Sequence, residues 1–94
     1  NHNDLLYGRT TITSIESNFS TWSFYYRRHL PESKEARILD IGCGEGGFIY
    51  FLRHLGYTNV VGIDLSAEQV ALGQELGIEG LIQGDLRPYL QSGE

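Results

Sequence analysis

The sequence predicts an α/β protein built on a parallel sheet, and three observations indicate this. Short apolar runs over residues 36–41, 59–64 and 80–84 alternate with stretches of helical periodicity. Each apolar run closes on or beside an acidic residue, and a glycine-rich turn follows the first run. Strands that alternate with helices indicate βαβ units with right-handed crossovers, and therefore a parallel sheet.

Start and stop signals place the helices between these strands. After the glycine turn, apolar residues over 48–55 recur at the spacing of one helix face, and Gly56 follows where a helix commonly ends. Ser66 and Gln69 have the spacing of a capping box that opens a second helix, which Gly77 ends. Residues 88–90 are expected to begin a further helix.

The N-terminal third is expected to be a separate part of the chain. Residues 1–13 carry little periodicity, whereas apolar residues over 14–30 recur at near-helical spacing, with Ser14 as N-cap and Pro31 as the stop. Its aromatic residues either cover one face of the sheet or also line a cofactor or acceptor pocket, and the sequence leaves both open. We therefore divide the chain into residues 1–35, an irregular segment with an aromatic-rich helix, and residues 36–94, an incomplete cofactor-binding domain.

Composition limits the classes of partner. The chain has 94 residues and a formal net charge of −5, which argues against a nucleic-acid surface. The single cysteine excludes an internal disulfide and favours the reducing cytoplasm. No apolar run approaches the ~20 residues of a membrane span, and no secretory leader is recognisable. Because the sequence does not begin with Met, we expect a processed chain or a fragment.

The glycine-rich turn is the predicted ligand site. Glycines at 42, 44, 46 and 47 allow positive φ and a close approach of the backbone to a ligand. Ligands of parallel α/β sheets bind beyond the carboxyl ends of the strands. Asp40, Asp64 and Asp85 lie in or directly after the three strands, so we expect them at the same edge as the turn.

Two of these acids have spacings that suggest roles. Asp64 follows Gly42 by 22 residues, close to the ~20 expected for an acid that accepts hydrogen bonds from ribose hydroxyls. The alternative, a cap for the following helix, is weaker because Ser66 fills that role. Asp85 could accept from an adenine amino group while the Leu86 N–H donates to the ring, or it could simply form a turn.

The glycines fit two cofactor patterns. Gly42, Gly44 and Gly47 match the dinucleotide pattern G-x-G-x-x-G, whereas the first two with Gly46 match G-x-G-x-G preceded by an acid. A pyrophosphate would be opposed by carboxylates at Asp40 and Glu45. A cofactor with an ammonium and a sulfonium, such as S-adenosylmethionine, would be favoured by them.

The segments LDIGCGEGGF, VVGIDLS and IQGDL together resemble the first three motifs of the class I (Rossmann-like) S-adenosylmethionine-dependent methyltransferases, over about residues 36–86. The resemblance implies a doubly wound parallel sheet and S-adenosylmethionine as cofactor. It implies that Asp40, Gly42, Gly44 and Gly46 surround the methionine part, that Asp64 binds the ribose, and that Leu65, Asp85 and Leu86 contact adenine. Cys43 belongs to the same turn, and we interpret it as turn-forming and not nucleophilic.

The chain departs from this family in length, because the sheet usually continues for several more strands that supply the acceptor pocket. We therefore expect a fold truncated after about three strands, completed by a missing C-terminal half or by a partner chain. The aromatic lead-in WSFYYRRHLP also resembles methyltransferases that modify sugars, so the acceptor is expected to be a small molecule or glycan. No catalytic residue and no metal site is predicted. A fragment of an NAD(P)-dependent oxidoreductase and a non-catalytic nucleotide-binding module remain as alternatives.

Overall fold

The computed structural model describes residues 10–88. The chain divides into two compact units, and the boundary between them along the sequence lies between Leu30 and Pro31. Each unit is described by itself. Within the described residues, no helix combines the length and the apolar character that a membrane crossing requires.

The first unit contains two short helices, α2 (Ile12–Glu16) and α3 (Phe19–Tyr26), followed by the 3₁₀ turn η1 (Arg27–His29). The prediction of one continuous helix with Ser14 as N-cap was wrong. Thr11 is the N-cap of α2, and its side chain and that of Ser14 form a reciprocal capping box. The carbonyl of Ser14 then accepts from the side chains of Ser17 and Asn18, which compete with the helical ladder and separate α2 from α3.

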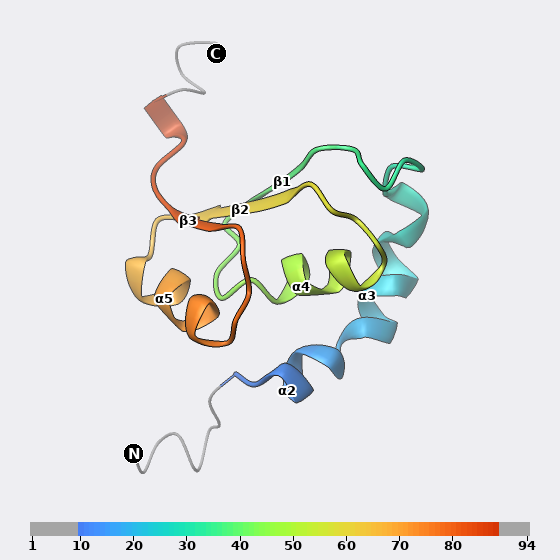
Figure 1. The fold of residues 1–94 in the computed structure, drawn as a ribbon, viewed down its shortest axis with the longest axis horizontal. Helices are drawn as coiled ribbons and strands as arrows, with labels where there is room; N and C mark the ends of the chain where they lie inside the picture. The colour runs from blue at the N-terminus through green and yellow to red at the C-terminus, as the bar shows by residue number, and fades with distance from the viewer. Residues whose placement is uncertain (1–9, 89–94) are drawn as a thin grey trace. The chain divides into compact units, whose positions relative to one another are not determined.

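The second unit carries the predicted βαβ arrangement (Figure 1). Its elements are β1 (Ile38–Ile41), α4 (Gly47–His54), β2 (Val60–Asp64), α5 (Ala67–Glu75) and β3 (Leu81–Gln83). The strands pair in the order β1-β2-β3, and both pairs are parallel. The predicted fold class is confirmed, and the strand ends that carry Asp40 and Asp64 share one edge of the sheet.

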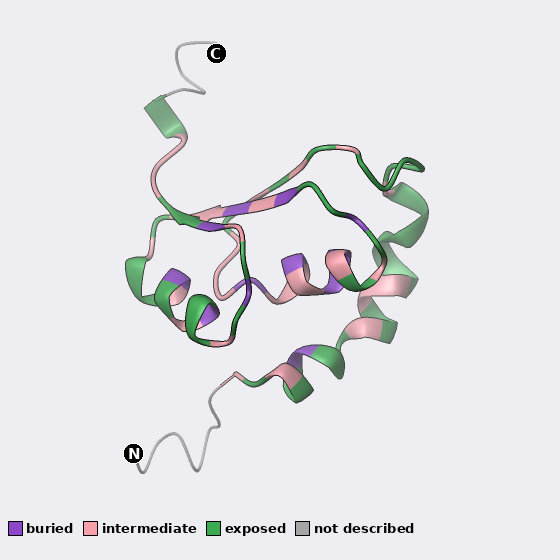
Figure 2. Cartoon of the chain, in the orientation of Figure 1, coloured by how far each residue is buried: buried purple, intermediate pink, exposed green. Residues whose placement is uncertain are grey.

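Helices α4 and α5 lie on the same face of this sheet (Figure 1). Right-handed crossovers that advance steadily from β1 to β2 to β3 place both helices on one side. The buried residues of the unit lie both on the helices and on the strands, which places the apolar core between the two layers (Figure 2). These buried side chains are Ile49, Phe51, Leu52, Tyr57, Val60, Val70, Ile78 and Leu81.

The opposite face of the sheet carries exposed apolar side chains. Leu39, Ile41 and Ile82 are 53%, 59% and 50% exposed. The strand register pairs Leu39 with Val61, and Ile63 with both Ile41 and Ile82, so these residues share one face. Large apolar side chains gathered in this way on a surface are typical of an interaction face.

We expect this face to drive self-association of the 94-residue chain. Replacing Leu39 by lysine should lower the weight-average mass measured by light scattering, because the charge must be desolvated wherever the face is covered. The matched control is Thr58→Lys, which adds the same charge at an exposed residue outside the sheet. Equal association of wild type and Leu39→Lys would contradict the prediction.

Candidate functional site

The turn after β1 is built on three glycines with left-handed backbone. Gly42, Gly44 and Gly46 have φ values of +76°, +57° and +90°. Gly47 is the first residue of α4, and its φ is not positive. The G-x-G-x-G spacing is therefore the one whose glycines all adopt the conformation that other residues avoid.

Strand β2 holds this turn through hydrogen bonds to its donors. The N–H groups of Gly42 and Cys43 both donate to the carbonyl of Ile63, at 2.7 and 3.2 Å. The N–H of Gly44 donates to Oδ2 of Asp64 at 2.8 Å. Three consecutive donors of the turn are thus satisfied by the end of the neighbouring strand.

Asp64 also fixes the start of α5. Its Oδ1 accepts the N–H of Ser66 at 2.8 Å, while the Ser66 hydroxyl accepts the N–H of Gln69 at 3.2 Å. In the predicted capping box the Ser66 N–H would pair with the Gln69 side chain, but here Asp64 takes that donor. The Asp64 carboxylate therefore joins the glycine turn to the helix that follows β2.

The carboxylates of Asp40 and Asp64 place negative charge beside the turn. The two N–H donors from Ser66 and Gly44 hold the pKa of Asp64 below its usual value. Partial burial and the charge of Asp64 raise the pKa of Asp40. Burial and the charges of both acids raise the pKa of the Cys43 thiol, which opposes thiolate formation.

Close packing supports the turn from the helix side. A Cβ on Gly73, in α5, would lie 2.1 Å from the carbonyl oxygen of Glu45 and 2.3 Å from Cδ1 of Leu81. A Cβ on Gly62 would lie 2.7 Å from Cβ of Cys43. Both glycines let neighbouring backbone approach the turn, and sequence patterns did not single them out for this role. An isolated glycine inside a helix is the signal that Gly73 offered.

A cleft of about 290 Å³ lies at the carboxyl ends of the strands. Ile41 and Gly42 contribute from the end of β1, and Ile63 and Asp64 from the end of β2. The apolar side chains among its lining suit a flat ring, and the carboxylates suit hydroxyl or amino donors. The remaining lining residues are Leu65, Gly84, Asp85, Leu86 and Arg87.

At the far end of this cleft, Asp85 is paired with Arg87. The carboxylate accepts Nε–H at 2.9 Å and Nη2–H at 2.8 Å, and Oδ1 also accepts the backbone N–H of Arg87 at 2.9 Å. These bonds lower the pKa of Asp85 to about 2. Arg87 is a lining residue that sequence patterns missed, and its position two residues after an acid in a turn was the available signal.

The structure brings together five of the nine predicted site residues as lining of the cleft. They are Gly42, Asp64, Leu65, Asp85 and Leu86. The other four belong to β1 and the turn and are not part of this lining: Asp40, Cys43, Gly44 and Gly46. Of these, Gly46 is buried, and a Cβ there would lie 2.8 Å from Cδ2 of Leu81, so packing also requires this glycine.

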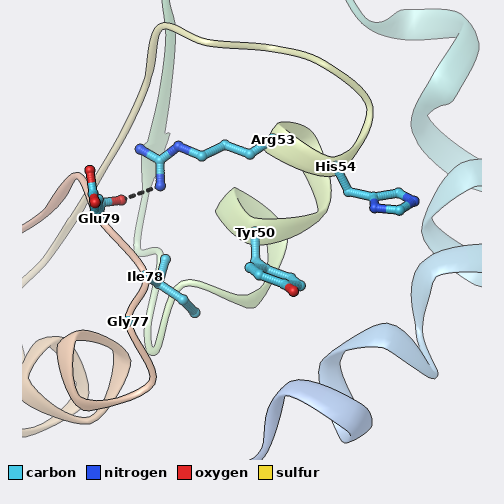
Figure 3. A pocket seen from close by; sticks show the side chains of 6 residues that line it. All are labelled: Tyr50, Arg53, His54, Gly77, Ile78 and Glu79. Carbon is cyan, nitrogen blue, oxygen red and sulfur yellow. Dashed lines mark hydrogen bonds between the residues drawn. The ribbon is translucent and has the colours of Figure 1, made fainter.

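A larger hollow, of about 410 Å³, lies beside the opposite end of β2 (Figure 3). Its lining includes Tyr50, Arg53 and Glu79. The Arg53 guanidinium donates to the carbonyl oxygens of Glu79 and Val60, so it anchors the connection that leads into β3. The lining of this hollow comes from α4 and from the connection that precedes β3, and none of the three strand-end acids is among its lining residues, so we assign the site to the smaller cleft.

Parallel strands, a glycine turn with left-handed backbone and acids at the strand ends define a Rossmann-like cofactor-binding fold. The chain belongs to the methyltransferase domain family: the family model described as "Methyltransferase domain" matches residues 38–90, more than half of the chain.

Individual relatives agree with this family. The chain is 46% identical over 39 residues to the cyclopropane-fatty-acyl-phospholipid synthase of Escherichia coli (strain K12), covering 42% of this chain and 10% of the relative. An S-adenosylmethionine-dependent methyltransferase from Mesorhizobium loti has a TM-score of 0.54 and 36% identity over 64% of this chain and 29% of its own. The plantazolicin methyltransferase BamL, solved with a triazolic desmethylPZN analog and SAH, has a TM-score of 0.53 and 30% identity over 82% of this chain and 29% of its own. The chain thus spans less than a third of the length of each of these relatives.

Proposed function

We propose that this chain is the S-adenosylmethionine-binding portion of a methyltransferase. The family to which it belongs supports the reaction class, and the geometry of the turn supports the cofactor. The acceptor we propose is a small molecule or a glycan. The solved relative BamL, which was crystallised with a triazolic desmethylPZN analog and SAH, supports the cofactor, and the class of acceptor is proposed from the sequence of residues 22–31.

The observation that carries the proposal is the hydrogen bond that the N–H of Gly44 donates to the carboxylate of Asp64. In a dinucleotide site, the donors of such a turn are directed at a pyrophosphate. Here the chain's own carboxylate takes this donor, and the neighbouring N–H groups of Gly42 and Cys43 donate to Ile63. An incoming phosphate would meet a negative charge in place of free donors, so the turn disfavours NAD and NADP.

The same carboxylates favour a ligand that is cationic at one end. Burial and, to a lesser extent, the charge of Asp64 raise the pKa of Asp40, and a bound ammonium or sulfonium would favour its charged form. Each oxygen of Asp64 accepts one N–H, which leaves further acceptor positions for the two hydroxyls of a ribose. Leu65 and Leu86 would then enclose the adenine ring in the cleft.

Within this proposal the chain's residues bind and orient the cofactor. A methyl transfer depends mainly on alignment of the sulfonium with the acceptor nucleophile, and a base is needed only for some acceptors. We assign no catalytic residue among residues 10–88.

Titration calorimetry of the 94-residue chain with S-adenosylmethionine, S-adenosylhomocysteine, NAD and NADP tests the cofactor. We expect saturable binding of the two adenosyl ligands and none of the dinucleotides. Binding of NAD alone would overturn the proposal in favour of an oxidoreductase fragment. A chain that is folded by circular dichroism and binds none of the four would favour a non-catalytic module.

The variant Asp40→Asn should stabilise the fold and lower the affinity for S-adenosylmethionine. Because the pKa of Asp40 is raised, its charged form is disfavoured in the folded chain, so stability gained by protonating it appears as the pH falls through that pKa. Asparagine removes the charge at every pH, so the unfolding midpoint at pH 7 should rise. Affinity for S-adenosylmethionine should fall about tenfold, through the loss of a charge-assisted contact.

The control for this variant is Glu79→Gln, which removes the same charge at an exposed residue near the opposite end of the sheet. It should leave the affinity unchanged. An Asp40→Asn chain with wild-type affinity would show that Asp40 does not face the cationic end of the ligand.

A further inference from the structure

Arg87 is the cation in the lining of the cleft, and its contacts with Asp85 are unusually complete for a surface pair. The side chains of Arg87 and Asp85 are 70% and 37% exposed. An exposed ion pair of two long side chains is usually loose. Here the two residues lie two positions apart, and a backbone hydrogen bond supports the two guanidinium bonds. The short connection and the third bond restrict how the carboxylate can rotate.

These bonds determine how many acceptor positions Asp85 retains. A carboxylate offers about four lone-pair sites, two on each oxygen. Oδ1 accepts both the backbone N–H and Nε–H of Arg87, so both of its sites are filled. Among residues 10–88, the one donor to Oδ2 is Nη2–H of Arg87. One acceptor position therefore remains, and it is on Oδ2.

We propose that Arg87 is a positioning residue that makes the cleft select a 6-aminopurine over a 6-oxopurine, by holding Asp85 as a fixed acceptor with one vacant position on Oδ2. This inference rests on the proposed function, because it takes the purine of the adenosyl cofactor as the ligand of Asp85. It adds a specificity-determining role for a residue outside the three motifs.

The selectivity follows from hydrogen-bond chemistry. The amino group of adenine donates, and the vacant position on Oδ2 accepts. The carbonyl of hypoxanthine also accepts, so it would face a carboxylate that cannot turn away while Arg87 holds it. Exclusion of water by the bound ring strengthens both the attraction and the repulsion. A freely rotating carboxylate could instead turn aside or keep a bridging water.

The test compares S-adenosylhomocysteine with S-inosylhomocysteine, its 6-oxo counterpart, by titration calorimetry on the full chain. In the wild type we expect the adenosyl ligand to bind at least about tenfold more tightly. Arg87→Ala should lower the ratio of the two affinities at least about threefold. S-adenosylhomocysteine would lose an oriented acceptor, whereas S-inosylhomocysteine would no longer meet a fixed carboxylate. Arg87→Lys, which can make only a single-point contact, should give an intermediate ratio.

A double-mutant cycle shows whether Arg87 acts through Asp85. Asp85→Asn should bring the ratio close to one, because an amide can rotate to present either a donor or an acceptor. In that background Arg87→Ala should change the ratio no further, as expected for two residues that act as one unit. The control Arg37→Ala removes an exposed arginine that directly precedes β1 and should leave the ratio at the wild-type value.

Three outcomes overturn the inference. Equal weakening of both ligands by Arg87→Ala would mean that Arg87 only supports the loop. An additional change of the ratio by Arg87→Ala in the Asp85→Asn background would mean that it acts independently of Asp85. If the wild type binds neither ligand, the proposed function fails and this inference fails with it, whereas each of the first two outcomes rejects the role of Arg87 alone.

Discussion

Replacing Gly73 by alanine is expected to lower the free energy of unfolding of the chain by about 2 kcal/mol. The added Cβ would lie 2.1 Å from the carbonyl oxygen of Glu45, which is backbone and cannot rotate aside. Overpacking of this kind costs about 3 kcal/mol, and the better helix propensity of alanine offsets about 1 kcal/mol of it. Urea unfolding followed by circular dichroism measures the difference.

Gly77→Ala is the contrast to this variant. Gly77 has a φ of +86° but open space around its Cβ position, so alanine there should cost only about 1 kcal/mol of backbone strain. Amide resonances of Gly44 and Gly46 should shift in Gly73→Ala and stay in place in Gly77→Ala, because only the first residue packs on the turn. A Gly73→Ala chain that is as stable as the wild type would show that α5 does not approach the turn this closely.

Replacing Asp64 by alanine is expected to remove most of the affinity for adenosyl ligands, by about tenfold to a hundredfold. The N–H groups of Gly44 and Ser66 would lose their acceptor, and so would the ribose hydroxyls under the proposed binding mode. The unfolding midpoint should therefore fall as well. Calorimetry and thermal unfolding on the same samples separate the two effects.

Asp64→Asn should restore part of the midpoint, because its single amide oxygen can accept one of the two N–H groups. The pH dependence has a defined sign. Since the pKa of Asp64 is below its ordinary value of 3.8, its contribution to stability is present above that value and is lost as the pH falls through the lowered one. This acid-dependent loss should be absent in Asp64→Ala. An unchanged affinity would reject the ribose role, and an unchanged midpoint would reject the role of Asp64 in fixing the turn.

Local signals were sufficient for much of the second unit. The stop signals at Gly56 and Gly77 and the N-cap at Ser66 lie where the helices end and begin. Apolar runs that alternate with helices correctly predicted a parallel sheet, because strands joined by helical crossovers pair in parallel. Both glycine patterns fit the sequence, because Gly46 and Gly47 are adjacent. The backbone angles were needed to choose between them, since Gly46 has a positive φ and Gly47 does not.

What the sequence left open depends on contacts between distant residues. The spacing of Asp64 from the turn suggested a ligand role, but its bond to the N–H of Gly44 arises only once β1 and β2 pair. The approach of Gly73 to Glu45 likewise requires the packed helix. In the first unit, the side chains of Ser17 and Asn18 interrupted a pattern of apolar spacing that took no account of hydrogen bonds to the backbone.

Among residues 10–88, no strand pairs with the outer edge of β1. Both crossovers advance in one direction away from β1 and use one face of the sheet. A strand that added to the free edge of β1 and continued in the opposite direction would place its own crossover on the bare face that carries Leu39 and Ile82. The reversal of winding would then fall beside β1, and such a topological switch point is where ligands of open α/β sheets bind. The glycine turn would lie at the centre of the completed crevice, with an acceptor able to enter from the newly added side.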